Sequence, residues 1–176
     1  MAKVALIYHL NLTHYSLNPL LRRFYLKSYL PKIIKAIKVP VNLSLTAEDI
    51  YCIQKANQLV FENLIKNSLI KFIRGTYSHV LVSEFPQDLG LQLKAANRVY
   101  NKLLPKPKIL PVAALPEFDF LPEQQVLLKQ YCPFFLVNHT IIRHDLSGEC
   151  RIIYRDLTKG RKTPYLLCVH KNTEYR

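Results

Sequence analysis

Short apolar segments of β-strand type alternate with longer segments of helical periodicity along most of this chain. Strands are expected at residues 3–10, 39–45, 70–75, 106–115 and 133–139. Amphipathic helices are expected between them, at residues 20–37, 46–69, 86–104 and 120–131. Such alternation is typical of a parallel sheet whose strands are joined by crossover helices. The sequence therefore predicts an α/β fold, in which ligands bind at the carboxyl ends of the strands.

The helical segments carry boundary signals that fix this pattern. In residues 20–37 the apolar side chains recur every three or four positions, basic side chains fill the other face, and Pro31 divides the helix into two pieces. Thr46, with the acidic pair Glu48 and Asp49 shortly after it, is typical of a helix N-terminus. Residues 143–176 differ, because turn signals there separate short β-like runs. We therefore expect one main unit over residues 1–142 and a β-rich extension, residues 143–176, that ends in a last strand of the sheet.

Polar side chains follow every expected strand. They are His9, Asn11 and His14 after the first strand, Ser44 and Thr46 after the second, Tyr77, Ser78 and His79 after the third, Glu117 and Asp119 after the fourth, Asn138 and His139 after the fifth, and His170 after the last. Gathered at one rim, such groups suit a sugar, whose hydroxyls both donate and accept hydrogen bonds. Simpler roles exist as well: the Thr-Tyr-Ser-His run fits local turn chemistry, and Glu117 fits a first-turn helix acid.

The chain is strongly basic, with 25 Lys and Arg against 12 Asp and Glu and a formal net charge of +13. Such an excess suits a polyanion or another acidic partner. The densest basic groups are Arg22, Arg23, Lys27, Lys32, Lys35 and Lys38 in one helical segment, and the run Lys159–Lys162. The first group fits a helix that lies on nucleic-acid phosphates, and a solvated helix face is the simpler interpretation.

Several function classes find little support in the sequence. The four cysteines, Cys52, Cys132, Cys150 and Cys168, form no CxxC pair, so we expect buried thiols in a reducing compartment and no zinc site. No HxH, HxxxH or GxSxG pattern occurs, so we expect no catalytic metal, no cofactor and no serine hydrolase. The N-terminal run resembles a strand and not a signal peptide, and no apolar run is long enough for a bilayer, so we expect a cytoplasmic protein with no membrane partner.

Two stretches of the chain are similar to motifs of a known enzyme family. Residues 73–108, IRGTYSHVLVSEFPQDLGLQLKAANRVYNKLLPKPK, combine a strand ending in Gly, a Tyr/Ser-His loop, and a helix leading to a Lys-Pro-Lys turn. Residues 110–139, LPVAALPEFDFLPEQQVLLKQYCPFFLVNH, combine a strand ending in Pro-Glu with a helix and a further strand. They resemble the second and third motif regions of glycoside hydrolase family 57, retaining enzymes that act on α-glucans. The resemblance covers about residues 3–142.

The resemblance implies a fold and a set of site residues. The family's N-terminal catalytic domain is an incomplete seven-stranded barrel, so residues 1–142 are expected to form a partial (β/α)7-type barrel with mostly parallel strands. By the match to the third motif, Glu117 is the catalytic nucleophile. His9, Asn11, Tyr77 and His79 would then shape the sugar subsite. The implied partner is an α-glucan or oligosaccharide.

This chain departs from the family pattern in three places. The first motif reads HLNLT, which keeps His9 but replaces the family's second His, Gln and Pro by Asn11, Leu12 and Thr13. The aromatic residue usual before the nucleophile is missing, and the general acid/base Asp belongs to a fourth motif that we do not find in this sequence. A retaining glycosidase needs two carboxyl groups roughly 5–5.5 Å apart. The resemblance therefore implies a truncated or reduced member that acts on or binds α-glucans, with a retaining mechanism if it is active, and that is impaired as an enzyme on its own.

Three further hypotheses concern partners. The last strand of an unfinished barrel exposes an unpaired edge, which predicts a homo-oligomer or a complementing chain. In a different class, the chain is a small basic nucleic-acid-binding module, or a non-catalytic structural subunit without a ligand. A steep dependence of affinity on salt would separate nucleic-acid binding from sugar binding.

Overall fold

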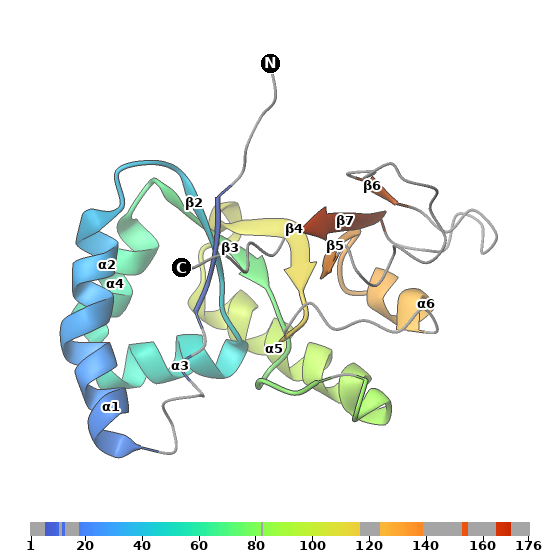
Figure 1. Ribbon diagram of the computed structural model, residues 1–176, viewed down its shortest axis with the longest axis horizontal. Coiled ribbons are helices and arrows are strands. Elements are labelled where there is room, and N and C mark those ends of the chain that lie inside the picture. Colours follow the sequence, from blue (N-terminus) through green and yellow to red (C-terminus); the bar gives the residue numbers. More distant parts are fainter. Residues whose placement is uncertain are drawn as a thin grey trace, which may run out of the picture.

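The computed structural model of the protein describes residues 6–10, 12, 18–81, 83–116, 124–138, 153–154 and 165–169 (Figure 1). Its strands are β1 (Ile7–His9), β2 (Val41–Ser44), β3 (Ile70–Arg74), β4 (Ile109–Ala114), β5 (Phe134–Asn138), β6 (Ile153–Tyr154) and β7 (Tyr165–Val169). Its α-helices are α1 (Pro19–Phe24), α2 (Leu30–Ala36), α3 (Ala47–Ala56), α4 (Gln58–Lys66), α5 (Leu89–Leu103) and α6 (Gln125–Lys129). A π-helical segment, η2 (Tyr25–Tyr29), joins α1 to α2, and single 3₁₀ turns, η3 (Pro86–Asp88) and η4 (Lys106–Lys108), precede α5 and β4.

The strands form one sheet in the order β1-β2-β3-β4-β5-β7-β6. Strands β1 to β5 and β7 run parallel to one another, and β6 runs antiparallel to β7. The sheet curls into part of a barrel, with helices connecting successive strands (Figure 1). The predicted fold class, a partial (β/α) barrel of mostly parallel strands, is confirmed. All parallel strands end at the same edge, which brings their following loops together.

The two faces of the sheet bury different residues because side chains alternate along a strand. Leu43 of β2 and Phe72 of β3 face the helices and belong to the main core with residues of α2, α3, α4 and α5. A second cluster joins Ala113 and Phe135 to α5 and α6. The inner face carries a smaller cluster built on Ile73, Ala114 and Leu136. The helices α1 to α4 gather beside β1 to β3, and α6 lies at the other end of the sheet (Figure 1).

Two helical segments differ in detail from their prediction. The expected break near Pro31 is present as the π-helical turn immediately before α2, where Leu30 N donates to Tyr25 O. Proline lacks an N–H and its ring crowds the carbonyl four residues earlier, so the chain widens at this point. The single helix expected over residues 46–69 is wrong: Asn57 ends α3 and its side-chain oxygen accepts from Val60 N to begin α4. No helix in the part of the chain that the structure describes is long and apolar enough to cross a membrane.

Candidate functional site

Two histidines and a serine meet where β1, β2 and β3 end. His9, the last residue of β1, has Nδ1 3.2 Å from Oγ of Ser44, the last residue of β2. The rings of His9 and His79 have centroids 6.2 Å apart and are tilted by 52°. Ser44 is only 2% exposed, whereas both histidines are half-buried. A neutral imidazole offers one hydrogen-bond donor and one acceptor, so these side chains can bind ligand hydroxyl groups, which also donate and accept.

The loop after β3 is held by its own polar side chains. Thr76 Oγ1 donates to the carbonyl of Ser78 at 2.6 Å. The backbone N–H of Ser78 donates to Gln92 Oε1 of α5 at 3.0 Å, and its hydroxyl lies 3.3 Å from the same oxygen. The turn-chemistry interpretation therefore holds for Thr76 and Ser78, which fix the loop. His79, the last residue of the run, is the one turned toward His9.

The same loop also caps helix α3. The backbone N–H groups of Ala47 and Glu48 donate to the carbonyls of Thr76 and Tyr77, at 3.1 and 2.8 Å. These are N–H groups that the first turn of a helix leaves without an intrahelical partner. The bonds tie the carboxyl end of β3 to the start of α3, so the position of the histidine-bearing loop depends on the helix that follows β2.

Asp49 is a buried carboxylate just behind this rim. It occupies the third position of α3, where its N–H donates to Thr46 Oγ1 at 3.2 Å and its own side chain accepts from Thr46. This reciprocal pair is a capping box. Asp49 is 1% exposed, and burial raises its pKa from 3.8 to about 6, against the opposing effect of the Thr46 hydrogen bonds. Its Oδ2 has no hydrogen-bond partner among the described residues.

Tyr100 of α5 braces the strand ends from behind. Its hydroxyl donates to the carbonyl of Leu45 at 2.6 Å and accepts from the N–H of Gly75 at 2.8 Å. The ring is fully buried, and this burial raises the pKa of its hydroxyl. A Cβ on Gly75 would lie 3.3 Å from the carbonyl oxygens of both Leu45 and Ala114, so a side chain here would have to push these backbone groups by a few tenths of an ångström. The Tyr100 hydroxyl thereby ties the end of β2 to the end of β3.

The predicted site residues fall into two groups. His9 and His79 are brought together, as the shared rim predicts. Tyr77 lies on the same loop and is 36% exposed, and its backbone carbonyl accepts from the N–H of Glu48. Asn11 and Glu117 lie outside the described residues, as do His14, Asp119, His139 and His170. Thr46, also expected at the rim, is a helix cap.

Comparison with solved structures shows a similarity of fold. No family model matches the chain, and no curated protein matches it in sequence. The fold is similar to the crystal structure of 4-alpha-glucanotransferase from Thermococcus litoralis, with a TM-score of 0.69 and 16% sequence identity. The match covers 94% of this chain and 27% of the glucanotransferase chain. The chain shares the fold of that protein. It spans about a quarter of that protein's length.

Sequence reasoning missed Tyr100, and it found Asp49 only as a helix-start acid. Tyr100 sits on the apolar stripe of α5 with Leu89, Leu93 and Ala96, so periodicity gives a core position. A tyrosine at a core position also indicates a hydrogen bond to another element, because a fully buried phenol hydroxyl needs hydrogen-bond partners. Within the described residues, no group of three or more His, Cys, Asp and Glu side chains is arranged to hold a metal ion.

Proposed function

We propose that this protein binds α-glucans at the rim formed by the carboxyl ends of β1, β2 and β3, as a relative of glycoside hydrolase family 57. The observation that carries the proposal is the convergence of His9, Ser44 and His79 on a fold shared with a 4-alpha-glucanotransferase. Imidazole and hydroxyl groups match the alternating donors and acceptors of a sugar. The braces behind the rim, at Tyr100 and at the start of α3, hold these groups in place before a ligand arrives.

Glu117 is the proposed nucleophile. It follows β4 in the chain by three residues, and β4 is the direct neighbour of β3, whose loop carries His79. In a retaining mechanism its carboxylate would attack the anomeric carbon and form a covalent glycosyl-enzyme intermediate, which water then hydrolyses. Asn11 and Tyr77 complete the proposed sugar subsite. Departure of the sugar leaving group needs a second carboxyl group as general acid, which is worth roughly 10²–10⁴ in rate. We assign that role to no described residue.

The first test is binding. Isothermal titration with maltohexaose should give a measurable affinity for the wild-type chain, and His9→Ala or His79→Ala should weaken it by about 2- to 10-fold, the worth of one hydrogen bond. Gln58→Ala, at an exposed hydrogen bond on α4, is the control and should leave affinity unchanged. Equal affinity in all four proteins would reject the rim as the site. Absence of any binding by the folded wild type would favour a structural subunit.

The second test concerns Glu117. An activated α-glucoside has a leaving group that departs without protonation, so the first release of this group reports attack by the nucleophile without help from a general acid. The wild-type chain should release the leaving group, and Glu117→Ala should not. Glucan binding with no hydrolysis in either protein would leave a binding function and remove the nucleophile assignment. Activity retained in Glu117→Ala would contradict the match to the family's third motif.

A further inference from the structure

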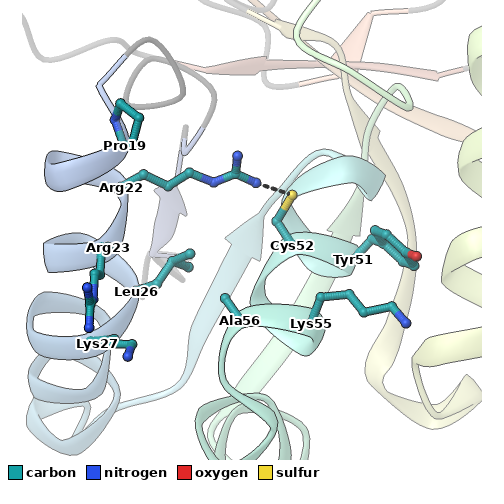
Figure 2. A pocket seen from close by; sticks show the side chains of 9 residues that line it. All are labelled: Pro19, Arg22, Arg23, Leu26, Lys27, Tyr51, Cys52, Lys55 and Ala56. Atoms are coloured by element: carbon teal, nitrogen blue, oxygen red, sulfur yellow. Dashed lines mark hydrogen bonds between the residues drawn. The ribbon is translucent and has the colours of Figure 1, made fainter.

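A basic groove lies between the first helical segment and α3, and none of the histidine-rim residues lines it (Figure 2). It has a volume of about 470 Å³. One wall is formed by Pro19, Arg22, Arg23, Leu26 and Lys27, and the other by Tyr51, Cys52, Lys55 and Ala56. Leu26 is buried at its floor, whereas Arg23, Lys27 and Lys55 are exposed at its edges.

The groove carries four positive charges, and its lining includes no acidic side chain. Arg22 reaches from α1 across to α3, where its Nη2 donates to Cys52 Sγ at 2.7 Å (Figure 2). Burial, the largest effect, raises the pKa of the Cys52 thiol despite the nearby guanidinium. A neutral thiol does not compensate the charge of Arg22, and the guanidinium has further N–H donors beyond the one that bonds Cys52. Cys52 is thus half-buried against an arginine, and the expectation that it is an ordinary buried thiol is wrong.

Acidic groups near the groove are few. Glu48 and Asp49 are close enough to Cys52 to act on its pKa, but Asp49 is buried in the capping box of α3. The opposite helical segment is richer still in positive charge. Residues 19–38 contain six basic residues and no acidic one. Lys32, Lys35 and Lys38, farther along the same stretch, are exposed as well.

The extended charge and the shape of the groove favour a chain-like anion. Four cations around one concave site, with three further exposed lysines in the same helical stretch, match a repeating phosphate backbone better than a single phosphate. Tyr51, 45% exposed at the groove, offers an aromatic ring, with Lys55 Nζ 5.5 Å from its centroid. Proteins that bind single strands without sequence preference combine a positive groove with aromatic rings on which bases stack. A flat anionic membrane would contact the exposed edges but not the floor.

We propose that this groove binds single-stranded nucleic acid, with Arg22, Arg23, Lys27 and Lys55 on phosphates and Tyr51 against a base. The proposal is independent of the α-glucan site, because it uses none of the rim residues. It also explains the net charge of +13, which sugar binding does not explain.

The test is fluorescence anisotropy of a labelled 20-nucleotide oligo(dT) and oligo(U) at several salt concentrations. The triple variant Arg23→Ala, Lys27→Ala, Lys55→Ala should reduce the slope of log affinity against log salt by about 2, because each phosphate that is no longer neutralised lowers it by roughly 0.7. Arg22 is kept because it donates to Cys52. The matched control removes the same charge from exposed positions elsewhere, as Lys94→Ala, Lys102→Ala, Lys106→Ala, and should change the slope much less. Tyr51→Ala should weaken binding by at least about fivefold.

Other results would overturn the proposal. Equal reductions in both triple variants would show diffuse attraction to a basic surface. Competition by AMP as effective, per phosphate, as by unlabelled oligonucleotide would show a site for a single phosphate. Binding of a poly-glutamate peptide as tight as that of the oligonucleotide, with no effect of Tyr51→Ala, would assign the groove to an acidic protein partner. No binding by the folded wild type at low salt would remove the site altogether.

Discussion

Replacing Tyr100 by Phe tests whether the strand ends are held by one phenol hydroxyl. The substitution keeps the buried ring but removes the oxygen that bonds both Leu45 O and Gly75 N. Both residues are buried, so each backbone group loses its partner where water does not replace it. An unsatisfied buried polar group costs about 1–3 kcal/mol, so Tyr100→Phe should lower the free energy of unfolding by about 2–6 kcal/mol. That is a large part of the stability of a typical domain.

Urea denaturation followed by circular dichroism measures this decrease, and amide exchange at Gly75 localises it. Tyr131→Phe is the matched control, since its hydroxyl donates to Gly90 O at 3.3 Å in a half-buried position. It should cost about 1 kcal/mol or less. If Tyr100→Phe lost no more stability than Tyr131→Phe, or if the Gly75 amide kept its protection, the hydroxyl would not be the brace we describe.

Two further predictions concern the same region. Asp49 has a folded pKa of about 6 against a usual 3.8, so its contribution to stability is fully present below 3.8 and is lost as the pH rises through 6. Relative to Asp49→Asn, the free energy of unfolding of the wild type should therefore rise by about 2 kcal/mol as the pH falls from 8 to 4. Urea titrations at each pH measure this difference. If the two proteins gave parallel pH profiles, burial would not raise the pKa of Asp49. Gly75→Ala places a methyl group 3.3 Å from two backbone carbonyl oxygens and should cost about 1–3 kcal/mol. An unchanged urea midpoint would mean that the neighbouring strand ends move apart easily.

The sequence predicted the sheet well because strand signals are local. The apolar runs at residues 39–45, 70–75 and 133–139 contain β2, β3 and β5 with only their ends trimmed. The break at Asn57 escaped prediction because apolar spacing continues across it, through Ile53, Val60 and Leu64. Its cause is a side-chain hydrogen bond to Val60 N, which competes with the helix in a way that periodicity does not report.

Of the candidate site, the sequence predicted only which residues lie at the ends of the strands. His9 and His79 were expected at one rim because parallel strands end at the same edge, and the structure brings them together. The hydrogen bonds that brace the rim and cross the basic groove join residues far apart in the chain, such as Tyr100 with Leu45 and Arg22 with Cys52. The local sequence around each of these four residues does not indicate its hydrogen-bond partner. Such pairings arise from the packing of whole helices against the sheet and against one another.

The anchoring of the loop after β3 has a consequence for how a ligand would be received. The loop carbonyls of Thr76 and Tyr77 are bound to α3, and Ser78 is bound to Gln92 of α5. Opening this loop would break hydrogen bonds to two separate helices at once. The loop that carries His79 is therefore a fixed wall and not a lid, so its conformational entropy is lost during folding and does not weaken the affinity for a ligand a second time.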